Sequence, residues 1–186
     1  MLKLVSKFSI TPGSEIDLED IAMIHVAGWQ GAYGGIIDQG YLDALSVEKK
    51  VQLWRQIIEE GDTQLLIARN EQEIAAGFCS FGKLKSPPPG MSAIRPLYTS
   101  ELYAIYILPA YWRQGLGREL MASSIAKLQK SKHNSVCLWV LEKNSRAVAF
   151  YKALGGQRCG KIDVEIGPTK AREICFGWRD FSNLLS

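Results

Sequence analysis

The chain has 186 residues, of which 47% are hydrophobic and 22% charged, with a formal net charge of +3. This length suits a single domain over residues 1–186, and the composition is that of an ordinary soluble protein. The small charge and scattered basic residues argue against nucleic-acid binding. Because no apolar stretch is long enough to span a bilayer and the N-terminus lacks a signal-peptide pattern, we expect a cytoplasmic protein without membrane contact.

The first half of the chain alternates between helical and strand-like patterns. We expect strands over residues 8–10, 64–69 and 74–82, and helices over residues 17–32 and 47–58. Ser46 is a favourable cap for the second helix, and a polar turn joins the last two strands into a hairpin. The residues between 84 and 99 include three successive prolines and predict a long loop, either a hairpin tip or a substrate lid.

Two glycines then join a strand to a helix. Residues 102–108 are apolar and strand-like, and Gly115 and Gly117 precede an amphipathic helix. The first amides of a helix have no partner within it, and glycines allow an anion to approach them. Arg113 and Arg118 add positive charge, so this segment predicts a phosphate site, although G-x-G alone also suits an ordinary turn. The frames of a P-loop and of a dinucleotide-binding fold are absent.

A second strand and helix follow directly. Residues 136–141 form a continuous apolar run typical of a buried strand, and Asn144 begins a helix that ends at Gly155. We expect a last hairpin from residues 157–166 and 172–178, followed by a short helical tail. The four cysteines are widely spaced and lie mostly in apolar runs, which predicts reduced core residues and no metal site. They are Cys79, Cys137, Cys159 and Cys175.

In this order, the segments of residues 101–156 resemble the GNAT superfamily of acetyl-CoA-dependent N-acetyltransferases. Residues 25–35 are similar to the first helix and loop of one branch, so the resemblance covers nearly the whole chain. It implies an α/β (α+β) fold with a central mixed, mostly antiparallel sheet of about seven strands. Four or five helices would flank this sheet, and its fourth and fifth strands would be splayed apart.

The resemblance implies that the chain binds acetyl-CoA. The loop would hold the pyrophosphate through its backbone amides, and the pantetheine would pair with the strand edge at Ile105 and Ile107, whose amide at 107 would polarise the thioester carbonyl. Asn144 would contact the cofactor or serve only as a helix cap. The family loop usually begins with Gln or Arg where Trp112 stands. The loop residues expected to bind the cofactor are Trp112, Arg113, Gln114, Gly115, Leu116, Gly117 and Arg118.

Two residues are candidates for proton transfer. Tyr151 occupies the position of the family's general acid, although a Tyr at this spacing also suits a core. Glu101 would act as a base through water, bind a cationic acceptor, or form a salt-bridged strand end. Even spacing predicts that Glu101 projects to the same face as Ile105 and Ile107. His25 is another conceivable base, but a lone His in a helix is more often structural.

Aromatic residues are expected to line the acceptor pocket, although any core of this size contains as many. They are Trp29, Tyr33, Tyr103 and Trp139. The implied reaction is direct acetyl transfer to a primary amine of a small molecule or peptide, without a metal and with a possible homodimer. The alternatives are a non-catalytic acyl-CoA sensor and a structural or interaction domain.

Overall fold

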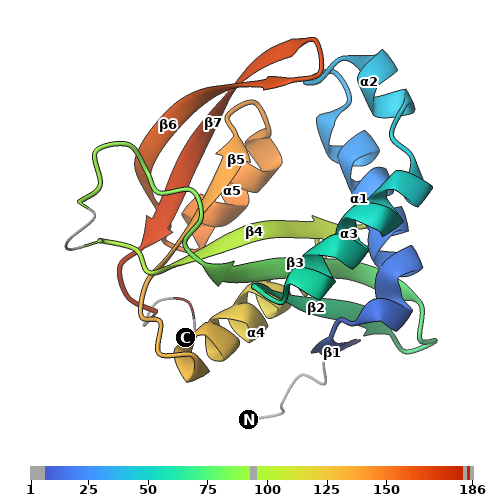
Figure 1. Cartoon of the computed structure of the whole chain (residues 1–186), viewed down its shortest axis with the longest axis horizontal. Helices are drawn as coiled ribbons and strands as arrows, with labels where there is room; N and C mark the ends of the chain where they lie inside the picture. Colours follow the sequence, from blue (N-terminus) through green and yellow to red (C-terminus); the bar gives the residue numbers. More distant parts are fainter. Residues whose placement is uncertain (1–6, 93–95, 182–183, 185–186) are drawn as a thin grey trace.

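The computed structural model describes residues 7–92, 96–181 and 184, and contains a seven-stranded sheet in the order β1-β2-β3-β4-β5-β7-β6 (Figure 1). Neighbouring strands are antiparallel except β4 and β5, which are parallel. This confirms the predicted mixed, mostly antiparallel sheet. The strands are β1 (Phe8–Pro12), β2 (Thr63–Asn70), β3 (Ala75–Lys83), β4 (Ser100–Ile107), β5 (Val136–Leu141), β6 (Gln157–Ile166) and β7 (Thr169–Trp178).

Helices cover both faces of the sheet. They are α1 (Leu18–Tyr33), α2 (Gln39–Asp43), α3 (Val47–Glu60), α4 (Leu116–Lys130) and α5 (Ser145–Ala153), with short 3-10 helices η1 (Glu15–Asp17) and η2 (Pro109–Tyr111). The sequence analysis missed α2, because its five residues are too few for a periodic pattern. Part of the expected C-terminal tail, residues 182–183 and 185–186, lies outside the described residues.

Two apolar clusters hold the helices in place. On one face, α1 and α3 pack against β2 and β3 through buried residues that include Ile21 and Trp54. On the other face, α4 and α5 pack against the sheet through residues such as Leu120 and Tyr151. Figure 1 shows α4 on the opposite side of the sheet from α1 and α3. The burial of these faces provides the main stabilisation of the arrangement.

β4 and β5 are paired only at their beginning. The register joins Ser100 to Val136 and Glu101 to Cys137, and no later residue of β4 pairs with β5 in the described chain. Beyond this point the two strands diverge, as Figure 1 shows. The expected splay between the fourth and fifth strands is therefore present.

A β-bulge interrupts β4. Ser80 of β3 lies opposite Ala104, and Phe81 lies opposite Leu102, so Tyr103 between them has no direct partner. An extra residue of this kind bends the strand and reverses the alternation of its side chains.

The bulge separates residues that even spacing placed together. Glu101 faces the side of α3, where it lines a small cavity with Trp54. Ile105 and Ile107 pack instead against the core on the α4 side. Our expectation that these three side chains share one face was wrong, because period-two alternation holds only along an unbroken strand.

The described part of the proline-rich loop packs on the sheet. Leu84, Met91 and Tyr98 contact the apolar cluster beside Trp139, whose indole N–H donates to the Ser86 carbonyl over 2.8 Å. Residues 93–95, which belong to the predicted lid or hairpin tip, lie outside the described residues. The loop thus covers β5 and its neighbours on the side away from α5.

Candidate active site

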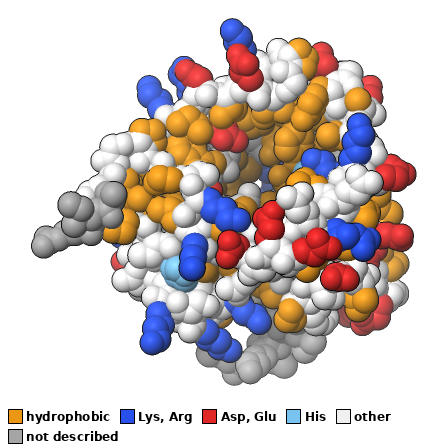
Figure 2. Space-filling view, in the orientation of Figure 1, with side chains coloured by type: hydrophobic (Ala, Val, Ile, Leu, Met, Phe, Trp, Pro, Cys, Tyr) orange, Lys and Arg blue, Asp and Glu red, His pale blue; other side chains and the backbone are white. Residues whose placement is uncertain are grey.

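A cavity of about 900 Å³ occupies the space between the diverging strands β4 and β5. Its lining comes from α1, β4, β5, α5 and the segment between β4 and α4. Figure 2 shows a hollow near the centre of the molecule, surrounded largely by hydrophobic side chains. A single space therefore connects the start of α4 with the end of α1.

The loop before α4 presents unpaired backbone amides to this cavity. Arg113 and Gly115 have left-handed φ values of 60° and 89°, a conformation that costs Gly little. Successive amides in such a turn converge and form an anion-binding concavity. Within the described chain, no backbone acceptor bonds the amides of Leu116 and Gly117, so the start of α4 has the donors that an anion requires.

The side chains of the loop are placed unequally. Arg113, Gly115, Gly117 and Arg118 line the cavity, together with Trp112. The Leu116 side chain is buried in the core, and the Gln114 amide group donates to the Ala110 carbonyl on the exposed surface. For Leu116 and Gln114, therefore, only the backbone is available to a ligand.

The edge of β4 directs backbone hydrogen-bonding groups of Ile105 and Ile107 into the gap. The Leu108 N–H donates to the Ala76 carbonyl on β3. Because consecutive residues of an antiparallel strand point their N–H and C=O groups to opposite edges, Ile107 and Ile105 direct theirs toward β5. The Trp112 indole N–H donates to the Ile107 carbonyl over 2.7 Å, which agrees with this direction.

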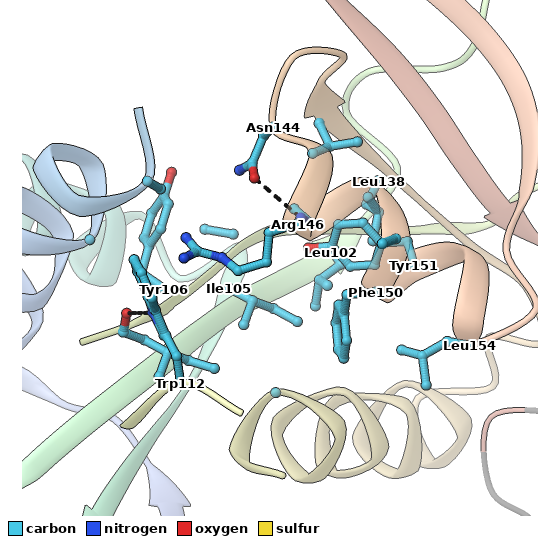
Figure 3. Close-up of a pocket in the computed structure, with 18 of the residues that line it drawn as sticks. Leu102, Ile105, Tyr106, Trp112, Leu138, Asn144, Arg146, Phe150, Tyr151 and Leu154 are labelled. Carbon is cyan, nitrogen blue, oxygen red and sulfur yellow. Dashed lines mark hydrogen bonds between the residues drawn. The ribbon is translucent and has the colours of Figure 1, made fainter. Parts of the chain in front are cut away.

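The start of α5 faces the same edge (Figure 3). The Asn144 side chain accepts a hydrogen bond from the Ala147 N–H over 3.2 Å, so it caps the helix while it also lines the cavity. Arg146 extends across the cavity toward Trp112, and its guanidinium carbon lies 3.2 Å from the centroid of the indole ring.

Tyr151 lies deeper along α5. Its ring packs against Phe150, Phe176 and Trp178 and is mostly buried, yet it lines the cavity. The hydroxyl has no hydrogen-bonding partner among the described residues. Burial, more than the nearby Tyr106 and Cys79, raises the pKa of Tyr151 above its ordinary value. The phenol is therefore protonated at neutral pH and has a proton to donate.

Glu101 lies beside the main cavity, in a second one of about 310 Å³. It is only 5% exposed, and one carboxylate oxygen, Oε2, accepts the backbone N–H groups of Lys85 and Ser86 at 2.9 and 2.7 Å. All its hydrogen bonds within the described chain use Oε2, so Oε1 remains available to the cavity. Ser80 also lines this space, and its buried hydroxyl has no partner in the described part of the chain.

The predicted aromatic residues occupy different positions. Tyr33, Tyr103 and Trp139 line the main cavity, and Tyr103 also lines the second one, so it lies between the two spaces. Trp29 is not part of the lining; its ring packs edge-on against Tyr33 with centroids 5.1 Å apart. It supports the wall that Tyr33 forms.

Comparison with known proteins matches this geometry to a family. Residues 36–155 match the acetyltransferase (GNAT) family. The chain belongs to this family. The uncharacterized N-acetyltransferase YuaI of Bacillus subtilis strain 168 is 34% identical to it over 168 residues, which cover 90% of this chain and 91% of YuaI.

Solved structures share the GNAT fold. The PaiA N-acetyltransferase of Thermoplasma acidophilum, in complex with coenzyme A, has a TM-score of 0.67 and 19% identity over 91% of this chain and 98% of its own. YncA of Salmonella typhimurium, with its cofactor acetyl-CoA, has a TM-score of 0.66 and 18% identity over 93% of this chain and 94% of its own. At these identities the likeness establishes the fold.

His25 of this GNAT protein lies outside both cavity linings. Its Nδ1 accepts the Trp54 indole N–H over 3.1 Å, and its ring packs 4.9 Å from that of Tyr106. Burial, with a smaller contribution from the charge of Lys50, lowers the pKa of His25 to about 3. The imidazole is therefore neutral and its lone pair is already in use, which is the structural role weighed above.

The sequence analysis missed two polar residues of the cavity, Tyr106 and Arg146. Tyr106 was hidden because the bulge changes which residues of β4 face each side. Arg146 could have been noticed in the sequence. A cation in the first turn of a helix opposes the helix dipole, which points to a specific role there. In the described residues, no group of three or more metal-ligating side chains comes together, and no helix is long and apolar enough to span a membrane.

Proposed function

We propose that this GNAT acetyltransferase moves the acetyl group of acetyl-CoA directly to a primary amine of a small molecule or peptide. The observation that carries the proposal is the single cavity that joins the amides at the start of α4 to the free edge of β4 and to Tyr151. An acceptor at the α1 end and a cofactor at the α4 end would share this space, as direct transfer requires.

The residues present fit acetyl-CoA, which would supply the acetyl group as a thioester. The amides of Leu116 and Gly117 would bind the pyrophosphate, with Arg113 and Arg118 adding positive charge. The β4 edge at Ile105 and Ile107 would pair with the pantetheine amides, and the Ile107 N–H would donate to the thioester oxygen. The coenzyme A bound to PaiA and the acetyl-CoA bound to YncA support a CoA thioester as the ligand.

Tyr151 and Glu101 divide the proton transfers in this proposal. The Tyr151 hydroxyl would give its proton to the departing sulfur, because it is protonated and lines the cavity. The free Oε1 of Glu101 would hold the acceptor's ammonium group or take a proton from it through water. The unpartnered Ser80 hydroxyl supports a polar acceptor group in the second cavity.

The test is release of free CoA thiol from acetyl-CoA, measured with a panel of polyamines, amino-acid derivatives, drug-like amines and peptides. We expect amine-dependent thiol release, and mass spectrometry should find the acetyl group on the amine nitrogen. Tight acetyl-CoA binding without turnover across the panel would favour a sensor. Absence of binding would favour a structural domain.

A further inference from the structure

Arg146 is a cation that lines the cavity without an anionic partner. None of the ion pairs or hydrogen bonds of the described chain involves its guanidinium. Other arginines differ: Arg69 pairs with Asp17 and Asp20, and Arg172 pairs with Asp163. The free donors of Arg146 therefore face the cavity.

The position of this charge is unfavourable for the protein alone. Arg146 is the second residue of α5, where the helix dipole disfavours a cation. Arg113 and Arg118 line the same cavity, and the positive end of α4 faces it as well. An anion bound in this space would be attracted by each of these positive groups and would offset their mutual repulsion.

Trp112 holds the guanidinium in place. Its indole N–H is bonded to the Ile107 carbonyl at the end of β4, which fixes the ring across the cavity. The Arg146 guanidinium stacks on this ring at 3.2 Å, and Figure 3 shows the pair spanning the space between α5 and β4. Stacking uses the face of a guanidinium and leaves the N–H groups at its edge free for a phosphate.

The same helix face approaches the loop. Phe150 lies one turn after Arg146, and its ring tip would be 3.2 Å from a Cβ atom placed on Gly117. This close packing sets α5 against the start of α4. Arg146 lies one turn earlier on this face, and it lines the same cavity as Gly115 and Gly117.

We infer that Arg146 binds the pyrophosphate of the acyl-CoA, and that Trp112 is a positioning residue that holds its guanidinium at the end of β4, in the cavity that the start of α4 also lines. The inference rests on the proposed function, since it adds a side-chain contact to the backbone site proposed for the cofactor. It also gives a role to Trp112, whose indole N–H is bonded to the Ile107 carbonyl and whose face carries the guanidinium.

The test is calorimetric binding of CoA and of pantetheine, which lacks phosphate, to the wild type and to Arg146→Gln. Hydrogen bonds to charged groups are worth about 1.5–3 kcal/mol, so CoA affinity should fall about tenfold to a hundredfold. Pantetheine affinity should not change. Lys152→Gln, an exposed cation of the same helix, is the matched control and should bind CoA like the wild type.

Two further variants test the role of Trp112. Trp112→Leu should weaken CoA binding. In the double variant with Arg146→Gln, CoA affinity should fall little further, because each single change already disrupts the stacked Arg146–Trp112 pair. Arg146→Lys should restore part of the lost affinity, since it keeps the charge without the planar stack. Fully additive losses would show that Trp112 does not position Arg146.

The outcomes separate the inference from the proposed function. If the wild type binds CoA and Arg146→Gln binds it equally well, the inference is wrong and the proposed function stands. If the loss seen with CoA disappears with 3′-dephospho-CoA, Arg146 binds the 3′-phosphate and the pyrophosphate contact is wrong. If the wild type binds no CoA, both proposals fail.

Discussion

At the α4 end of the cavity the proposed ligand-binding groups come mainly from one short stretch of backbone, whereas at the α1 end they come from side chains on distant segments. The α4 end presents the amides of Leu116 and Gly117 and the edge of β4. The α1 end combines Tyr33, Tyr103, Trp139 and, through the second cavity, Glu101. Backbone recognition tolerates many side chains, so one end can stay constant while substitutions at the other change the acceptor.

The largest expected effect comes from a substitution in the proposed phosphate site at the start of α4. Gly117→Glu should reduce CoA affinity about a hundredfold or more, because the carboxylate would repel the pyrophosphate and occupy its space. Gly117→Ala is the matched control: its Cβ would lie 3.2 Å from the tip of the Phe150 ring, so only a small shift is needed. Calorimetry on variants shown to be folded by circular dichroism tests this. Wild-type affinity in the Glu variant would remove the phosphate site from the α4 end.

Tyr151 lines the main cavity from α5, and removing its hydroxyl should affect the chemical step. Tyr151→Phe keeps the ring packing, and kcat should fall about a hundredfold, the lower end for general acid catalysis. Because the pKa of Tyr151 is raised, its protonated form persists at alkaline pH, and this group should cause no loss of kcat below about pH 10. If chemistry limits the rate and kcat is unchanged while the melting temperature falls, Tyr151 is a core residue.

A smaller effect is expected from Glu101 at the acceptor side. Glu101→Gln removes the charge but keeps an oxygen that can accept the Lys85 and Ser86 N–H groups. The acceptor's KM should rise about tenfold, with CoA affinity unchanged, if the carboxylate holds an ammonium group. Loss of the acidic limb in kcat/KM would indicate a base instead. Reduced thermal stability with unchanged kinetic constants would leave Glu101 with its structural role in the loop.

The smallest kinetic effect should come from His25, which supports the α1 end from behind Tyr106. Its folded-state pKa of about 3 lies below the ordinary value of 6.5, so the unfolded chain binds a proton that the folded chain does not. The stability from His25 is therefore complete above pH 6.5 and is lost as the pH falls toward 3.

As the pH falls from 6.5 to 4.5, the His25 contribution to the unfolding free energy of the wild type should decrease by about 2 kcal/mol. Urea unfolding of the wild type and of His25→Gln across this range isolates the contribution, because other groups titrate in both proteins. The difference between the two proteins should narrow as the pH falls, with kcat at neutral pH nearly the same. An unchanged difference would show that the pKa of His25 in the folded state stays near its ordinary value of 6.5.

Local patterns were sufficient for the order of strands and helices and for the loop before α4. Gly115 adopts a left-handed φ that favours glycine whatever its neighbours, and the apolar runs of β4 and β5 indicate their burial directly. Short α2 escaped prediction, since Asp38 caps it and its five residues make no periodic stripe. The unpaired amides at the start of α4 were also accessible from the sequence, because they depend on the local chain conformation.

Which side chains face the cavity depended on the tertiary structure. The bulge at Tyr103 turns Glu101 away from Ile105 and Ile107, and no pattern within β4 reveals it, because it results from pairing with β3. Arg146 meets Trp112 only because α5 packs against the start of α4 through Phe150. The sequence by itself determined the family, the element order and the amide loop, which depend on local conformation and periodic burial. Only the tertiary structure decided which charges meet across the cavity, because those contacts join segments distant in the chain.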